Sequence, residues 1–148
     1  MEKRISWDEY FTEIAELVSK RSTCRRQVGA VLVKNNRIIA TGYNAQPVGK
    51  EECTYCKRKQ FTQGNGLEQC TVVHAEVNAI TQCALQGISC QDAILYVTTK
   101  PCIWCLKTII NAGIKKVIYI EDYNAPDTDL LAKDCNIELI KFKGEWYI

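Results

Sequence analysis

The sequence has little of several features that define large classes of proteins. It contains no apolar run long enough to cross a bilayer, and its first ten residues are charged and lack the apolar core of a signal peptide. The formal net charge is only +2, from 19 basic and 17 acidic residues. This net charge is far too weak to argue for a generally basic surface of the kind that binds nucleic acid or anionic membranes. We therefore expect no membrane and no nucleic-acid partner, and a location in the cytoplasm, or in the host cytoplasm if the chain is viral.

Histidine is almost absent from the chain, whereas cysteine is abundant. His74 is the only histidine among 148 residues, and there are nine cysteines. In a secreted chain of this length, nine cysteines would suggest disulfide bonds. Because the chain lacks a signal segment and has C-x-x-C spacings at residues 53–56 and 102–105, the cysteines instead indicate reduced thiols and metal binding.

The pattern of apolar residues predicts a single α/β domain over residues 1–148. Stretches with helical periodicity alternate with short apolar or β-branched runs. Helices are expected over residues 7–21, 74–86, 101–112 and 127–134, and strands over residues 28–34, 37–41, 93–98, 116–120 and 137–142. A hairpin followed by alternating helices and strands predicts a mixed five-stranded sheet covered by helices. Residues 45–72 show no periodicity, and so long a loop is usually functional or needs to be fixed in place.

Two short motifs carry residues suited to chemistry. His74-Ala75-Glu76 offers an imidazole and a carboxylate, and Pro101-Cys102-Ile103-Trp104-Cys105 offers two thiols on one face of an expected helix. One nitrogen and two sulfurs provide three protein ligands for zinc, and the fourth tetrahedral position is left for water, as in catalytic sites. Zinc lowers the pKa of its bound water to about 7, and the nearby Glu76 can take and pass on a proton of that water.

Each motif by itself has a less specific interpretation. An isolated histidine is more often structural than a ligand, and a single C-x-x-C also occurs in redox sites and in closed structural zinc sites. A redox or chelating C-x-x-C would leave His74-Ala75-Glu76 unexplained. The two motifs together favour a catalytic zinc site over these alternatives.

The two motifs form the known signature of zinc-dependent deaminases, H-x-E followed by P-C-x-x-C. The chain resembles the cytidine deaminase superfamily and, within it, the deoxycytidylate (dCMP) deaminase family over nearly its whole length. The stretches that carry the resemblance are Arg21–Cys24, Val28–Val31, Thr41–Asn44, His74–Ile80, Tyr96–Thr98 with Pro101-Cys102, Ala112–Val117 and Glu121–Tyr123. The resemblance implies a three-layer α/β/α fold and the hydrolytic deamination of dCMP to dUMP, which supplies thymidylate synthesis.

The resemblance also implies site residues, position by position. The zinc ligands would be His74, Cys102 and Cys105, with Glu76 as the proton shuttle. The residues expected around the substrate are Asn44, Ala75, Tyr123, Thr23 and Arg26. Asn44 would contact the nucleoside, whereas Tyr123 and the stretch from Thr23 to Arg26 would lie near the sugar or the phosphate. If the family resemblance is set aside, the simpler interpretation is that Asn44 is a turn residue and that Arg26 is an ordinary surface arginine.

Assembly and regulation are implied by the resemblance alone. It suggests a homo-oligomer that is activated by dCTP and inhibited by dTTP, with Mg²⁺ accompanying a nucleotide effector. Two departures from the family pattern bear on this regulation more than on catalysis. Ala45 follows Gly-Tyr-Asn where glycine is common, and Leu85 stands where many members carry a basic residue near the end of the helix.

The remaining cysteines predict a second, structural zinc. Cys83, Cys90 and Cys135 are scattered and are interpreted as small buried residues. The others lie in or near the irregular stretch, at Cys24, Cys53, Cys56 and Cys70. A closed four-thiolate site would fix a loop that has too few apolar residues to pack, and members of the resembled family can carry such a zinc. The spacing leaves open whether Cys53 and Cys56 both bind, and four free thiols remain the alternative.

Two other functions stay open at the level of sequence. A deaminase of another base or nucleotide, such as adenosine in tRNA or free cytidine, would share the same zinc motifs. A tRNA enzyme should present a basic face, which the weak net charge does not favour. A zinc-binding interaction module without catalysis would instead need a closed site with four protein ligands.

Overall fold

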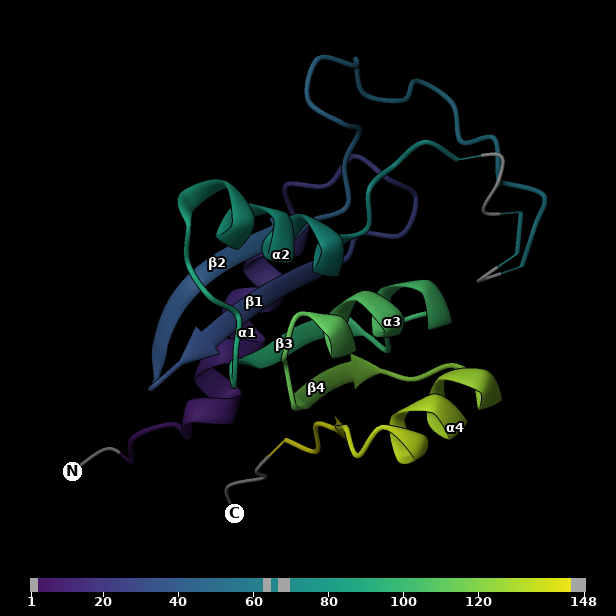
Figure 1. Ribbon diagram of the computed structural model, residues 1–148. Helices are drawn as coiled ribbons and strands as arrows, with labels where there is room; N and C mark the ends of the chain where they lie inside the picture. Colours follow the sequence, from purple (N-terminus) through teal and green to yellow (C-terminus); the bar gives the residue numbers. More distant parts are fainter. Residues whose placement is uncertain (1–2, 63–64, 67–69, 145–148) are drawn as a thin grey trace.

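The computed structural model describes residues 3–62, 65–66 and 70–144 (Figure 1). Within these residues the elements are α1 (Trp7–Ser19), β1 (Gly29–Lys34), β2 (Arg37–Tyr43), α2 (Ala75–Gln86), β3 (Ile94–Thr99), α3 (Ile103–Asn111), β4 (Lys116–Glu121), α4 (Pro126–Asp134) and β5 (Glu138–Lys141). Every helix and strand expected from the apolar pattern is present, and the ends differ by a few residues. None of the described helices is both long enough and apolar enough to span a membrane.

The helix boundaries follow local capping. Ser6 begins α1, because its side-chain oxygen accepts a hydrogen bond from the Glu9 N–H at 3.1 Å. The helix ends at Ser19, two residues before the predicted end, because Lys20 and Arg21 donate to carbonyls three residues back and so form a tighter turn. Gly87 ends α2 in the left-handed conformation at φ 70°, as predicted from its position.

The five strands form one mixed sheet in the order β2-β1-β3-β4-β5. β1 pairs antiparallel with β2 and with β3, whereas β3, β4 and β5 are parallel. The predicted hairpin is confirmed: Asn35 and Asn36 connect β1 to β2 with φ values of 52° and 58°. Two successive positive φ values fit the turn whose twist matches that of a β-hairpin.

Helices cover both faces of the sheet and give three layers (Figure 1). Successive β1 residues face opposite sides: Val31 and Val33 pack with Phe11 of α1, whereas Ala30 and Leu32 join the larger core beneath α2, α3 and α4. The expected α/β/α arrangement is therefore confirmed.

The helix starts gather at one edge of the sheet. β2, β3 and β4 run in the same direction, so α2 and α3 both begin near the edge where these strands end. Gly42 near the end of β2 allows α2 to approach closely, because a Cβ there would collide with the backbone of Ala75 and Ala79. The segment that precedes β1 and the irregular residues after Ala45 lie at this same edge (Figure 1).

Candidate metal centre and active site

The starts of α2 and α3 bring the three predicted zinc ligands together. His74 and Cys102 are the N-cap residues of α2 and α3, and Cys105 lies in the first turn of α3. The Nδ1 atom of His74 is 3.2 Å from the Sγ atom of Cys105 and 3.6 Å from that of Cys102. One ligand atom from each residue lies within 4.8 Å of the others. These three form the only such group of His, Cys, Asp or Glu within the described part of the chain.

The donor set fits zinc. Neither His74 nor Cys102 uses its side chain to cap its helix, so both side chains are free to turn toward Cys105. Two ligands of one tetrahedral zinc, a nitrogen and a sulfur, would be about 3.6 Å apart, close to the distances observed here. The pKa of Cys102 is lowered to about 4, because its sulfur accepts a hydrogen bond from the Cys105 thiol and lies beside His74. Thiolate and imidazole are ligands that zinc prefers.

Glu76 is a buried carboxylate beside this cluster. It lies in the first turn of α2 and is only 4% exposed. Burial raises the pKa of its carboxyl above the usual value, and the neighbouring His74 opposes this increase. A raised pKa makes the carboxylate a stronger proton acceptor, as a general base requires.

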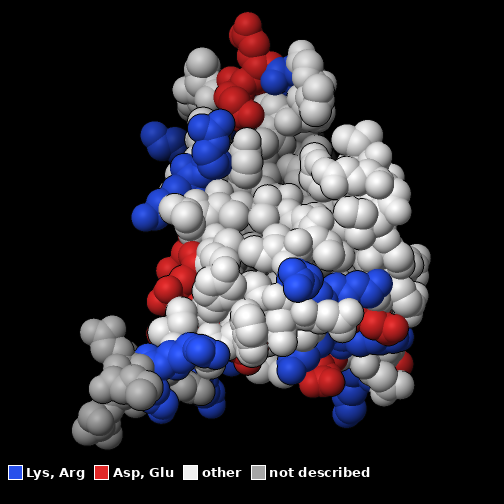
Figure 2. Space-filling model, turned by 90° about the vertical axis from the view of Figure 1, so that its left-hand side faces the viewer, with Lys and Arg blue, Asp and Glu red and all other residues white. Residues whose placement is uncertain are grey.

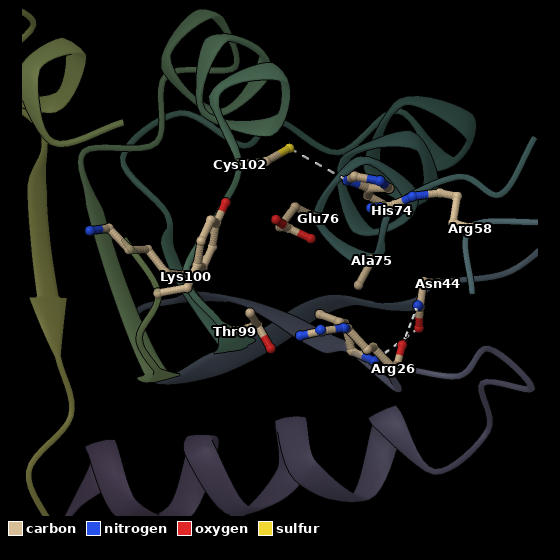
Figure 3. A pocket seen from close by; sticks show the side chains of 11 residues that line it. Arg26, Asn44, Arg58, His74, Ala75, Glu76, Thr99, Lys100 and Cys102 are labelled. Atoms are coloured by element: carbon tan, nitrogen blue, oxygen red, sulfur yellow. Dashed lines mark hydrogen bonds between the residues drawn. The ribbon is translucent and has the colours of Figure 1, made fainter. Parts of the chain in front are cut away.

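A pocket opens in front of Glu76 (Figure 3). Its walls come from six separate parts of the chain and consist of Arg26, Val28, Asn44, Arg58, His74, Ala75, Glu76, Thr99, Lys100, Cys102 and Tyr123. Figure 3 shows Glu76 and His74 together at the centre and the side chains of Arg26 and Arg58 entering from different segments. The pocket thus joins the metal-ligand cluster, a buried carboxylate and the side chains of two arginines and one lysine.

Asn44 fixes the shape of one wall. Its Nδ2 donates to the Arg26 carbonyl at 2.7 Å, and its Oδ1 accepts from the Val28 N–H at 2.9 Å (Figure 3). The amide therefore holds the segment that carries Arg26. An amide oxygen has a second lone pair, so Oδ1 can still accept a hydrogen bond from a ligand.

Comparison with known proteins agrees with this geometry. The family described as "Cytidine and deoxycytidylate deaminase zinc-binding region" matches residues 5–121. The chain belongs to this family. Deoxycytidylate deaminase of Schizosaccharomyces pombe is 44% identical over 126 residues, which cover 82% of this chain and 39% of that protein. Deoxycytidylate deaminase of Mycobacterium phage D29 is 40% identical over 124 residues, which cover 78% of this chain and 95% of that protein.

A solved structure of this family shares the whole fold. The dCMP deaminase of cyanophage S-TIM5, crystallised in complex with dCMP and dUMP, superposes with a TM-score of 0.81 at 32% identity. The match covers 95% of this chain and all of that one, 100%. The chain therefore spans 95% of the phage D29 enzyme and 100% of the S-TIM5 enzyme, but only 39% of the S. pombe protein.

Of the residues that the deaminase family resemblance placed near the substrate, most line the pocket. Asn44, Ala75, Arg26 and Tyr123 do so. Thr23 does not: it is exposed, and its hydroxyl donates to Glu52 Oε2 at 3.0 Å. It lies instead in the neighbouring hollow between the segment after α1 and the irregular loop.

Sequence reasoning missed four residues that line the pocket, namely Val28, Arg58, Thr99 and Lys100. Thr99 is the last residue of β3 and Lys100 stands between it and Pro101, so their place next to the motif could have indicated a position at the site. Arg58 comes from the irregular loop, where no periodicity or motif indicates which way a side chain points.

The four cysteines of the predicted structural zinc line one hollow, which also contains Thr23 and Glu52. Cys24, Cys53, Cys56 and Cys70 are far apart in the sequence, and the fold brings them to the same place. Burial raises the pKa of the Cys24 thiol, with smaller contributions from Cys70 and Cys53. Their sulfurs do not form a set of three within 4.8 Å in the described part of the chain, so the second zinc stays a prediction.

Proposed function

We propose that this chain catalyses the hydrolytic deamination of dCMP to dUMP, supplying thymidylate synthesis. The single observation that carries the proposal is the buried carboxylate of Glu76 beside the His74, Cys102 and Cys105 cluster, at the base of a pocket that also holds two arginines. Membership of the deaminase family and the names of its relatives support it. The overall reaction adds water to the base and releases ammonia.

His74, Cys102 and Cys105 would hold the zinc ion, which when bound supplies a water molecule that is activated at neutral pH. Glu76 takes a proton from the attacking water and delivers it to ring nitrogen 3 of cytosine as the oxygen adds to carbon 4. Glu76 then transfers the second proton to the amino group, which leaves as ammonia. Glu76 is buried in the pocket beside the ligand cluster, so the same carboxyl is placed to take up the first proton and to deliver the second.

Arg26 and Arg58 would bind the 5′-phosphate. Both line the pocket, and guanidinium groups bind phosphate through several hydrogen bonds at once. The Nε of Arg58 already donates to the Asn65 carbonyl at 2.8 Å, which orients its remaining N–H groups. Asn44 and Tyr123 would contact the nucleoside. This arrangement favours a nucleoside monophosphate over an uncharged nucleoside.

Deamination of another base, such as adenosine in tRNA, is the alternative function, because the zinc motifs are shared. On the face shown in Figure 2, the basic side chains lie in separate groups next to acidic ones, around a broad area without charged side chains. A protein that binds tRNA through its phosphates would gather basic side chains over a continuous surface. This face carries no such continuous basic surface, and the formal net charge of the chain is only +2, which together support a small nucleotide as substrate.

We also infer a second zinc at the four-cysteine hollow, a homo-oligomer, and regulation by dCTP and dTTP with Mg²⁺ accompanying the effector. The hollow supports the zinc, whereas the resemblance to the family is the sole support for assembly and regulation. All nine cysteines are free thiols in this structure, which supports a reducing compartment such as the cytoplasm, or the host cytoplasm for a viral chain.

A side-by-side assay tests the proposed function. Purified protein with its metal content measured is given dCMP, deoxycytidine, cytidine, dCTP and an adenosine-containing tRNA in turn. We expect dCMP to have the highest kcat/KM, with deoxycytidine at least about tenfold lower because it lacks the phosphate. No turnover of dCMP by zinc-loaded protein would contradict the proposal. Turnover of tRNA alone would establish the alternative, and zinc without any turnover would indicate a binding module.

A further inference from the structure

Lys100 carries a buried charge at the wall of the pocket. It follows β3 and is 5% exposed, the only lysine or arginine counted as buried among the described residues. Its Nζ lies 2.8 Å from Oδ1 of Asp129 and 3.5 Å from Oδ1 of Asp122. A buried ammonium group needs such partners, because burial without them strongly disfavours the charge. The two carboxylates are partly exposed, at 57% and 45%, so the lysine is the member that the fold encloses.

Two further hydrogen bonds join the same segments. The Lys100 N–H donates to the Glu121 carbonyl at 2.9 Å. The hydroxyl of Thr128, which is 1% exposed, donates to the Pro101 carbonyl at 3.2 Å. The chain just before the Cys102 ligand is therefore attached to residues 121–129 at several points.

Tyr123 lies between these attachment points and lines the pocket. Asp122 precedes it, and Asp129 lies in the first turn of α4, so the two partners of Lys100 stand on either side of Tyr123 in the chain. Figure 3 shows the ammonium group of Lys100 turned away from Glu76. The ammonium group of Lys100 thus faces Asp129 and Asp122, so its contact with the pocket runs through the segment that these partners belong to.

We propose that Lys100 is a positioning residue: its ion pairs with Asp129 and Asp122 hold the segment that carries Tyr123 against the pocket and thereby set the affinity for the substrate. This inference rests on the proposed function. According to this inference, the ion pairs of Lys100, which directly precedes the P-C-x-x-C motif, set the position of the pocket wall that contains Tyr123. Because Lys100 does not touch the reacting atoms, its removal affects binding more than the chemical step.

The test compares Lys100→Met, Lys100→Arg and the control Lys133→Met, which removes an exposed charge from α4. Hydrogen exchange is measured for the amides of residues 122–125 in zinc-loaded protein, together with zinc content and with KM and kcat for dCMP. In Lys100→Met we expect faster exchange in this segment, an unchanged zinc content, a KM raised about tenfold and a kcat within about twofold of the parent. Lys100→Arg should restore much of the KM, and Lys133→Met should match the parent.

Unchanged exchange at residues 122–125, or a fall in kcat at constant KM, would overturn the inference. If Lys100→Met does not fold, Asp122→Asn and Asp129→Asn each remove one partner and leave the lysine in place, and the same two readouts decide. A parent protein that does not turn over dCMP refutes the proposed function. The exchange measurement still decides whether Lys100 holds the Tyr123 segment, so the two failures are distinguishable.

Discussion

The Nδ1 atom of His74 lies 3.2 Å from the Sγ atom of Cys105, although 31 positions separate the two residues in the chain. This contact joins the first turns of α2 and α3. Because Glu76 is two residues after His74, the same contact fixes the distance from the buried carboxylate to the metal ligands. The geometry of proton transfer is therefore linked to that of metal binding.

Glu76→Gln should separate metal binding from catalysis. The amide has the same shape as the carboxyl but cannot take a proton, so we expect kcat for dCMP to fall by about 10²–10⁴-fold. Zinc content and melting temperature should stay close to those of the parent, since Glu76 is not among the three clustered ligands. Elemental analysis measures the zinc content, and a spectrophotometric deamination assay measures kcat. Glu138→Gln, an exposed change on β5, serves as the control, and a fully active Glu76→Gln protein would refute the proton-shuttle role.

Arg26→Gln and Arg58→Gln should weaken the binding of the phosphate without affecting the base. A hydrogen bond to a charged group contributes about 1.5–3 kcal/mol, so each change should raise KM for dCMP by roughly 10–100-fold. The kcat/KM for deoxycytidine, which has no phosphate, should change by less than about threefold. Arg37→Gln removes an exposed arginine at the start of β2 and provides the matched control. Equal losses with both substrates would contradict a phosphate-binding role.

A second zinc site should be visible in the number of zinc ions bound per chain. Protein purified without chelator should contain about two zinc ions per chain, and Cys70→Ser should contain about one. Limited proteolysis of the Cys70→Ser variant should cleave residues 45–72 faster, because the loop loses its cross-link. Cys135→Ser changes a half-buried thiol outside the hollow and should keep both ions. A single zinc in the parent, with rapid alkylation of all four cysteines of the hollow, would rule this site out.

Tyr96→Phe tests a buried contact between the sheet and α1. The Tyr96 hydroxyl donates to Asp8 Oδ1 at 2.7 Å, and the change should lower the free energy of unfolding by about 1–2 kcal/mol at neutral pH. Burial, followed by the bond to Asp8, raises the pKa of Tyr96 above its usual value of 10.0. The protonated hydroxyl therefore contributes its stability in full below about pH 10, and this contribution is lost as the pH rises from there toward the folded-state pKa.

The difference between the parent and Tyr96→Phe should accordingly shrink above about pH 10. Urea unfolding at a series of pH values measures it, with Tyr55→Phe as the control, because Tyr55 is 65% exposed. A difference that grows in the alkaline range would contradict a stabilising role of the protonated Tyr96 hydroxyl.

Much of the fold could be predicted because its elements depend on local patterns. The β-branched run of β1, the Asn35-Asn36 turn and the glycine after α2 specify their structures through backbone preferences of neighbouring residues. Only the ends of elements differed from the predicted ones. The end of α1 is an example, because the sequence pattern of a tighter final turn is the same as that of a continuing helix.

By itself, the sequence determined the elements, the mixed sheet and the grouping of His74, Glu76, Cys102 and Cys105. Both motifs lie at helix starts, and the strands β2 and β3, which run in the same direction, end at one edge of the sheet. Only the tertiary structure decided which other charges reach the pocket. Arg58 comes from a loop without periodicity, and the partners of Lys100 come from a later turn and helix. Contacts between distant segments set those positions, and no local backbone preference records them.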